Sequence, residues 1–160
     1  MPELKQVVIY TDGACIGNPG PGGYGAVLLY NQHRKELSGG YSLTTNNRME
    51  LMAAIKALGM LKEKCKVTLH SDSKYVVDAM AKGWARKWKS NGWKRNKRDA
   101  ALNPDLWEEL IQLYDRHQVD FRWVRGHAGI AENERCDILA VEGAQQPDLP
   151  TDSGYVNGRS

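Results

Sequence analysis

The stretch that decides the fold is residues 7–30, VVIYTDGACIGNPGPGGYGAVLLY. Its first part, Val7 to Tyr10, is a β-branched and aromatic run typical of a buried strand, and it ends at Thr11-Asp12-Gly13. The Pro- and Gly-rich residues 17–23 predict a loop, because this density of Pro and Gly disfavours both helix and strand. The chain is therefore expected to open with a strand that has a carboxylate at its end.

The rest of the chain alternates strand and helix patterns. Tyr24 to Tyr30 and Arg34 to Tyr41 predict an antiparallel hairpin, and a helix is expected after Thr44-Thr45-Asn46-Asn47. That helix has one apolar stripe of Leu51, Ala54, Leu58 and Leu61. The later patterns predict a strand at 66–71, helices near 75–80, 84–89 and from Asn103-Pro104, a strand at 119–123, and a helix at 132–143. This order implies an α/β fold, a mixed sheet with helices on its faces.

Composition narrows the class of protein. The chain has 160 residues, 41% of them apolar, which suits one globular domain with a sizeable core. Its three cysteines, Cys15, Cys65 and Cys136, lack paired zinc spacing and point to a reducing, cytoplasmic compartment. No apolar run approaches the ~18 residues of a membrane helix. Membrane-spanning, secreted, collagen-like and disordered classes are therefore excluded.

The positive charge is concentrated in one segment. Residues 82–98 contain eight of the 22 Lys and Arg residues and none of the 19 Asp and Glu residues, so the rest of the chain is acidic overall. A basic segment on an acidic body favours a polyanionic partner gripped by one region. A solvated face is the alternative explanation of such a run.

Three carboxylates occupy positions from which they could converge. Asp12 and Asp72 each follow an apolar strand run, and Glu50 lies near the start of the first long helix. Taken singly, Asp12 could form a turn, Asp72 could cap a helix, and Glu50 could complete a capping box with Asn47. Taken together, a carboxylate cluster would bind a hard cation such as Mg²⁺ or Mn²⁺. No HExxH, GxSxG or Walker motif supports another hydrolytic mechanism.

Five collinear motifs closely resemble the bacterial ribonuclease HI family, the type 1 ribonucleases H. They are the stretches TDGAC with GNPGPGGYG (11–25), TNNRMEL (45–51), SDS (71–73), VRGHAG (124–129) and NERCD (133–137). The resemblance covers about Leu4 to Tyr155. It implies a ribonuclease H-like fold, a five-stranded mixed sheet of three antiparallel N-terminal strands plus two parallel ones, flanked by helices. We expect residues 1–144 to form this single domain, and 145–160 to be a partly disordered tail.

The resemblance also implies an activity, metal-dependent endonucleolytic hydrolysis of the RNA strand of RNA/DNA hybrids to 3′-OH and 5′-phosphate ends. The implied metal ligands are Asp12, Glu50, Asp72 and Asp137, which would hold two Mg²⁺ ions with substrate, Mn²⁺ being a possible substitute. His127 is implied to shuttle protons, although a lone loop histidine is often only solvated or a cap.

The implied substrate contacts fall into three groups. Minor-groove contacts would come from Cys15, Asn18, Asn46, Asn47 and Lys74, the last departing from the Gln that relatives often carry. A DNA-phosphate pocket would be formed by Thr45, Arg48 and Asn103, and a DNA-strand groove by Trp84 and Trp107, each of which could instead be core. Lys87, Lys94 and Arg95 would belong to a basic protrusion that grips the hybrid.

Two other functions stay open at this point. A hybrid-binding module without catalysis would keep the substrate residues and dispense with the acids. A DNA-processing nuclease of the same fold would keep the acids and differ in substrate. The resemblance favours a monomer that cleaves RNA in hybrids.

Overall fold

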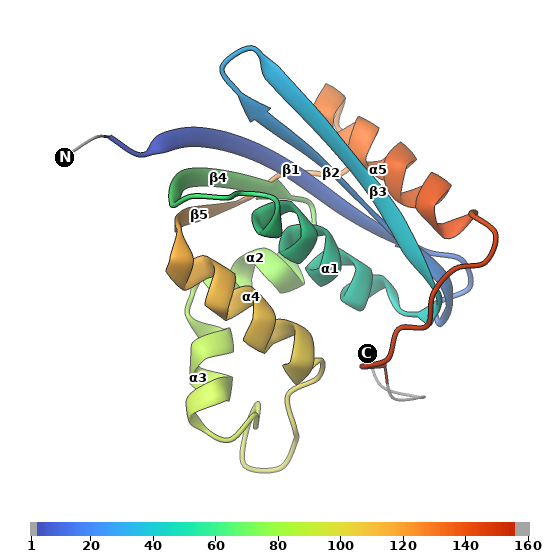
Figure 1. The fold of residues 1–160 in the computed structure, drawn as a ribbon. Helices are drawn as coiled ribbons and strands as arrows, with labels where there is room; N and C mark the ends of the chain where they lie inside the picture. Colours follow the sequence, from blue (N-terminus) through green and yellow to red (C-terminus); the bar gives the residue numbers. More distant parts are fainter. Residues whose placement is uncertain (1–2, 156–160) are drawn as a thin grey trace.

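In the computed structural model, which describes residues 3–155, five strands pair in the order β3-β2-β1-β4-β5 (Figure 1). The elements in chain order are β1 (Lys5–Cys15), β2 (Gly20–Tyr30), β3 (His33–Thr44), α1 (Asn46–Gly59), β4 (Cys65–Ser71), α2 (Lys74–Ala81), α3 (Trp84–Ser90), α4 (Pro104–Arg116), β5 (Gln118–Trp123) and α5 (Ala131–Ala144). The first three strands are antiparallel, and β4 and β5 run parallel to β1. The predicted element order and mixed sheet are confirmed.

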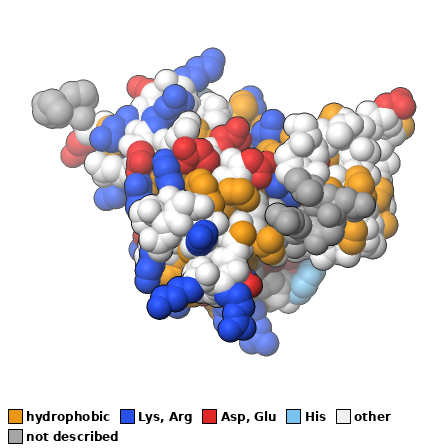
Figure 2. All heavy atoms as spheres, turned by 90° about the horizontal axis from the view of Figure 1, so that it is seen from below, with side chains coloured by type: hydrophobic (Ala, Val, Ile, Leu, Met, Phe, Trp, Pro, Cys, Tyr) orange, Lys and Arg blue, Asp and Glu red, His pale blue; other side chains and the backbone are white. Residues whose placement is uncertain are grey.

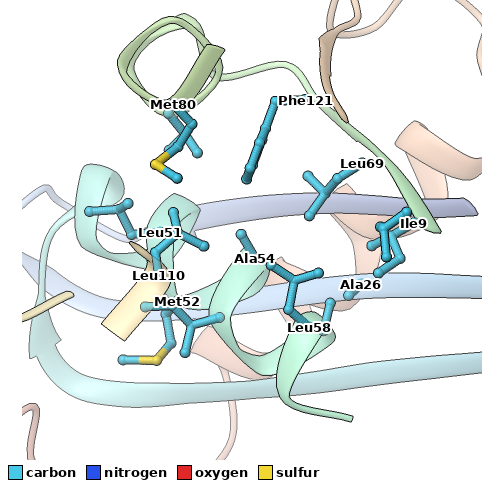
Figure 3. Packing of buried hydrophobic residues seen from close by; sticks show 14 of the residues in the cluster. Ile9, Ala26, Leu51, Met52, Ala54, Leu58, Leu69, Met80, Leu110 and Phe121 are labelled. Carbon is cyan, nitrogen blue, oxygen red and sulfur yellow. The ribbon is translucent and has the colours of Figure 1, made fainter. Parts of the chain in front are cut away.

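The two faces of the sheet are covered by different helices. Helices α1, α2 and α4 lie on one face, and α5 lies on the other, against β1, β2 and β3 (Figure 1). The main core forms under α1, where Leu51, Ala54 and Leu58 of the predicted stripe are buried against strand residues such as Ile9 and Leu69 (Figure 3). A smaller cluster beneath α5 contains Val27, Cys136 and Leu139.

The prediction of a loop at residues 17–23 is wrong for residues 20–23, which are part of a strand. Strand β2 begins at Gly20, and Gly22 and Gly23 pair with Cys15 and Ala14 of β1. Both glycines are close to neighbouring elements: a Cβ at Gly22 would lie 2.8 Å from Cγ of Met49 on α1, and Gly23 faces α5. A Cβ at Gly23 would overlap the backbone carbonyl of Ala140 on α5. The glycine-rich composition therefore reflects close packing of a helix on a sheet, in addition to the turn that precedes it.

The caps of α1 and α2 are not the acidic residues that could have served there. Thr45 caps α1 and accepts from the backbone N–H of Arg48, and Ser73 caps α2 and accepts from Val76. Neither Glu50 nor Asp72 is therefore needed as a cap. Asn103 occupies the cap position of α4 as predicted, but with a left-handed backbone and no capping hydrogen bond from its side chain. Its amide is used elsewhere.

The segment after α5 returns across the molecule toward the start of α1 (Figure 1). The backbone N–H of Ser42 donates to Pro150 O at 2.9 Å, and the buried side chain of Asp152 contacts Thr44 and Arg48. Residues 145–155 thus make defined contacts, and the expected disorder at 156–160 concerns residues outside the described part. Within residues 3–155, no helix combines the length and apolar character needed to cross a membrane.

Candidate active site

Three acidic side chains from separate elements meet beside the sheet. Asp12 lies within β1, which continues to Cys15 rather than ending before the acid, Asp72 directly follows β4, and Glu50 is the fifth residue of α1. One carboxylate oxygen of each lies within 4.8 Å of the others. Asp12 and Glu50 are buried and Asp72 is half-buried. The structure thus brings together the three acids that the sequence placed at element ends.

Gly13 allows α1 to come this close to β1. A Cβ at Gly13 would lie 2.5 Å from the backbone N of Glu50 and 2.5 Å from the carbonyl carbon of Met49. Any larger residue would therefore push the helix away from the strand. The glycine next to Asp12 sets the distance between the two buried carboxylates.

The cluster is electrostatically strained without a counter-ion. Burial raises the pKa of Asp12 to about 7, with a further contribution from the charge of Asp72, although the N–H of Gly13 donates to Asp12 Oδ1 at 2.9 Å. Burial and the neighbouring Asp12 raise the pKa of Glu50 well above its ordinary value. Oε1 of Glu50 is buried with no hydrogen-bond partner. An all-oxygen donor set with an unpartnered oxygen fits a hard divalent cation.

The other two predicted members of the centre lie at its edge. Asp137 is half-buried on α5, and its charge adds to the rise in the Asp12 pKa, but it is outside the group of three converging oxygens. His127 is exposed, with φ of 55°, in the loop between β5 and α5. The neighbouring Gly126 touches the acid centre, since a Cβ there would lie 2.8 Å from Oδ2 of Asp72.

Trp123, which sequence analysis placed only as a strand residue, supports Asp72. Its indole N–H donates to the backbone carbonyl of Asp72 at 3.1 Å, and the Nζ of Lys74 lies 4.7 Å from the centre of its ring. The side chain is 44% exposed. The alternation of residues along β5 cannot identify this contact, because the contact depends on Asp72, which follows the neighbouring strand β4.

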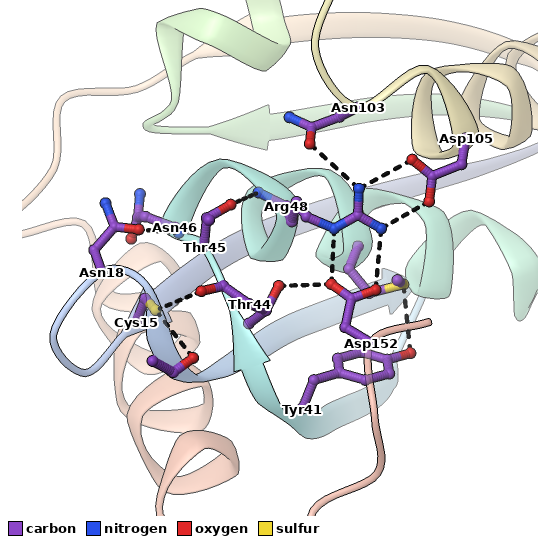
Figure 4. A network of polar contacts seen from close by, with 12 residues as sticks. Cys15, Asn18, Tyr41, Thr44, Thr45, Asn46, Arg48, Asn103, Asp105 and Asp152 are labelled. Atoms are coloured by element: carbon purple, nitrogen blue, oxygen red, sulfur yellow. Dashed lines mark hydrogen bonds and ion pairs between the residues drawn. The ribbon is translucent and has the colours of Figure 1, made fainter. Parts of the chain in front are cut away.

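The predicted minor-groove residues of the β1–β2 turn lie next to those at the start of α1. The backbone N–H of Asn46 donates to Oδ1 of Asn18 at 3.1 Å, and the thiol of Cys15 points at the carbonyl of Thr44 at 3.4 Å (Figure 4). Asn18 is exposed, and Asn46 and Asn47 are half-buried at the start of α1. The glycine-rich loop and the α1 N-terminus therefore form one surface beside the acids.

Arg48 is held by carboxylates in a way that sequence analysis missed. Its guanidinium donates to Asp105 at 2.9 and 2.7 Å, to Asp152 at 2.7 and 3.0 Å, and to Asn103 Oδ1 at 3.2 Å (Figure 4). These bonds use all five N–H groups of the side chain, which is 2% exposed. In this structure the guanidinium is thus committed to these three side chains, and its contact with a phosphate stays a prediction. Asp105 and Asp152 had no sequence signal beyond the fact that they are charged.

The two predicted groove tryptophans have different surroundings. Trp107 is fully buried, packs edge-on against Tyr75 and Trp88, and donates from its indole N–H to the hydroxyl of Tyr75 at 3.2 Å. The prediction that Trp107 lines an open groove is therefore wrong, because α2, α3 and α4 enclose its ring. Trp84, at the start of α3, is 43% exposed and has the Nζ of Lys82 over its ring at 5.1 Å.

The basic segment projects from the body on α3 and the loop that follows it (Figure 1), and Lys and Arg side chains are spread over that face (Figure 2). Part of its charge is neutralised by acids from other segments: Lys82 pairs with Asp78, Arg86 with Asp115, Lys89 with Glu108, and Arg95 with Asp99. Among the described residues, no acid forms an ion pair with Lys87, Lys94, Lys97 or Arg98. These four are the free cations of the segment.

Comparison with known proteins agrees with the fold. The RNase H family profile matches residues 4–145. A ribonuclease H of Syntrophus aciditrophicus is 68% identical over 94% of this chain and 87% of its own length, and a ribonuclease HI of Synechocystis is 59% identical over 94% and 95%. The crystal structure of LC9-RNase H1, described as a type 1 RNase H with the type 2 active-site motif, superimposes with a TM-score of 0.79 at 37% identity, covering 90% of this chain and 74% of that one. The chain belongs to the RNase H family.

Proposed function

We propose that the protein is a metal-dependent endonuclease that hydrolyses the RNA strand of RNA/DNA hybrids and leaves 3′-OH and 5′-phosphate ends. The observation that carries this proposal is the meeting of Asp12, Glu50 and Asp72 within 4.8 Å, in a chain of the RNase H family. The names of its relatives supply the substrate class. The catalytic domain is taken as residues 1–144, and residues 145–155 pack against it.

The acid cluster is the metal site in this proposal. Asp12, Glu50 and Asp72 would hold the ions, with Asp137 completing the set from α5. Two Mg²⁺ ions bound there would activate a water and neutralise charge on the phosphate. The chain's own contribution is to fix the ligands: Gly13 brings Glu50 to Asp12, and Trp123 holds the backbone of Asp72.

His127 is assigned the proton transfer. Its imidazole is exposed on a short loop, and Gly126 in that loop touches Asp72. A side chain so placed can give a proton to the leaving 3′ oxygen. We expect His127→Ala to lower kcat about 100-fold and to leave hybrid binding intact. His33→Ala, at an exposed site on β3, is the control. A near wild-type rate for His127→Ala would remove this residue from the mechanism.

The remaining contacts explain selection of the hybrid. Short polar groups of Cys15, Asn18, Asn46 and Asn47 suit the 2′-OH groups of the RNA strand. Thr45 and Asn103 are assigned to one phosphate of the DNA strand, and Trp84 to the groove beside it. Lys74 adds a positive charge near Asp72 through its position on Trp123.

One assay separates this function from the alternatives. Hybrid labelled on the RNA strand is incubated with Mg²⁺ or with a chelator, and duplex DNA and duplex RNA are the controls. We expect cuts in the RNA of the hybrid alone, lost with the chelator and in Asp72→Asn. Binding without cutting would support a catalytically inactive binding module, and cutting of duplex DNA would support a DNA-processing nuclease.

A further inference from the structure

We infer that Asp152, in the segment after α5, is a positioning residue for the DNA-strand phosphate contact, and that it acts through Arg48 on Thr45 and Asn103. This inference rests on the proposed function, which assigns Thr45 and Asn103 to that phosphate. It gives the C-terminal segment a part in substrate binding.

The first step is the attachment of Asp152 on both sides of Thr45. Oδ2 of Asp152 accepts from the hydroxyl of Thr44 at 2.7 Å and from Nε of Arg48 at 2.7 Å, and Oδ1 accepts from Nη2 of Arg48 at 3.0 Å (Figure 4). Thr44 directly precedes Thr45, the cap of α1, and the backbone N–H of Arg48 donates to the Thr45 hydroxyl. One carboxylate, 6% exposed as a residue, therefore ties the end of β3 to the first turn of α1.

The second step is the orientation of the Asn103 amide. Its Oδ1 accepts from Nη1 of Arg48 at 3.2 Å, and its Nδ2 donates to the hydroxyl of Tyr75 at 3.2 Å. The opposite amide orientation would turn an NH₂ group toward the guanidinium, which has no acceptor. Arg48 thus fixes the orientation of the amide, with Oδ1 toward the guanidinium and Nδ2 toward Tyr75, and the second N–H of Nδ2 is the donor that we assign to the phosphate.

The third step is that Asp152 is the buried partner that holds the Arg48 guanidinium in place. Its neighbour on the other side, Asp105, has a side chain that is 42% exposed, whereas the side chain of Asp152 is 4% exposed. A buried, charge-assisted contact holds a guanidinium more firmly than a solvent-exposed one. Beside these groups lies a cavity of about 360 Å³ lined by residues that include Arg48, Asn103 and Gly154. The C-terminal segment therefore forms part of the wall next to the assigned phosphate site.

The direction of the expected effect distinguishes positioning from simple electrostatics. Asp152→Asn removes a negative charge, and on charge alone it would strengthen binding to a polyanion. If Asp152 positions the phosphate contact, the same change weakens binding. We expect KM and Kd for hybrid to rise about five- to twenty-fold, as for the loss of one charged hydrogen bond, with kcat at saturation within about two-fold of wild type.

The matched control is Asp148→Asn. It removes the same charge from the same segment, at an exposed site whose left-handed backbone asparagine also tolerates. We expect this variant to bind hybrid as well as wild type or better. All measurements are made well below the melting temperature of each variant, with the folded fraction checked by circular dichroism.

Combining protein variants with modified substrates shows which phosphate the loss of binding concerns. Hybrids are made with single methylphosphonates along the DNA strand, and one of these should weaken binding by wild type. We expect that substitution to have little effect on Asp152→Asn and on Arg48→Lys, the latter keeping the charge and losing the fork. Asn103→Ala combined with Asp152→Asn should bind no worse than Asn103→Ala alone.

Two results would overturn the inference. In one, Asp152→Asn and Asp148→Asn bind hybrid equally well. In the other, Asp152→Asn stays as sensitive as wild type to every methylphosphonate. Either result, with wild-type cleavage of hybrid intact, leaves the proposed function standing. Failure of wild type to cleave hybrid in Mg²⁺ would instead contradict the proposed function.

Discussion

Asp12 and Glu50 place two acids in a buried position that a soluble protein avoids unless something binds there. Burial and mutual repulsion raise both pKa values, that of Asp12 to about 7. A raised carboxyl pKa means that the folded state holds its proton more tightly than the unfolded state. The stabilisation from that proton is complete below about pH 4 and is lost as the pH rises through about 7. The metal-free protein should therefore become less stable across this range.

Asp12→Asn tests this pH dependence. The amide has no charge to bury, so the metal-free variant should melt at a higher temperature than wild type at pH 8. The free energy of unfolding should be higher by about 2–4 kcal/mol at most, and the difference should shrink at pH 5. Thermal unfolding followed by circular dichroism in a chelator gives both values. Equal melting temperatures at pH 8 would show that Asp12 is not strained.

Mg²⁺ should narrow the difference in stability between the two proteins. A ligand bound only by the folded state adds stability that grows with concentration, about 1.4 kcal/mol at ten times its dissociation constant. We expect the melting temperature of wild type to rise with Mg²⁺ and that of Asp12→Asn to respond little. Ca²⁺ and K⁺ at matched ionic strength separate site binding from salt effects. A rise of equal size in both proteins would count against a metal site at Asp12.

Sequence reasoning found the acids but not their supports. Asp12, Glu50 and Asp72 could be singled out because each stands beside a recognisable apolar pattern. Asp152 and Trp123 could not, because their roles depend on which distant segment they meet in space. The same holds for Trp107, for which the resemblance implied a groove and a core position was the alternative, because only the packing of the helices shows that it is core.

At the scale of elements, the site depends on how closely α1 approaches β1. The backbone of Glu50 lies where a Cβ on Gly13 would be, so the helix packs on the strand at the point where the acids meet. Strand and helix positions were predictable from periodicity. The glycine strand at residues 20–23 was not, because glycine can serve either a loop or a helix contact.

Gly13→Ala should separate the two carboxylates. The new methyl group would force α1 outward, with an expected loss of about 1–3 kcal/mol in the free energy of unfolding. The rate of Mg²⁺-dependent cleavage should also fall, because the carboxylates move apart. Gly59→Ala is the control, since a Cβ at this last residue of α1 meets nothing within 4 Å and should add about 0.5–1 kcal/mol. Chemical unfolding and hybrid cleavage are measured on both. Full activity of Gly13→Ala would show that the close approach is unimportant.

At the scale of the whole molecule, the last described residues close the structure over α1 and α4. Pro150 accepts from Ser42 on the edge strand β3, and Asp152 is buried against Arg48. A chain ending at Gln145 would leave the guanidinium with Asp105 as its one carboxylate partner, and we expect it to lose about 3 kcal/mol of stability. A chain ending at Tyr155 keeps the described contacts and should match wild type. Equal unfolding curves for the two truncations would mean that residues 1–144 are self-sufficient.

The uneven charge of the molecule sets how its binding should depend on salt. Of the eight cations in residues 82–98, Lys87, Lys94, Lys97 and Arg98 have no acid paired with them in the described chain, and they belong to α3 and the loop that follows it. If these four meet phosphates, log affinity for hybrid should fall with log salt at a slope of about −4.

Reversing Lys87 and Lys94 to Glu should reduce that slope to about −2 and raise KM steeply, while kcat at saturating hybrid stays near wild type, because neither residue is a member of the acid cluster. Lys35→Glu with Lys66→Glu makes the same charge change at exposed sites on β3 and β4. Binding by fluorescence anisotropy from 50 to 300 mM salt compares the two pairs. If both pairs weaken binding alike, only net charge matters and the basic segment has no dedicated role; if the first pair alone does, the segment is the surface that grips the hybrid.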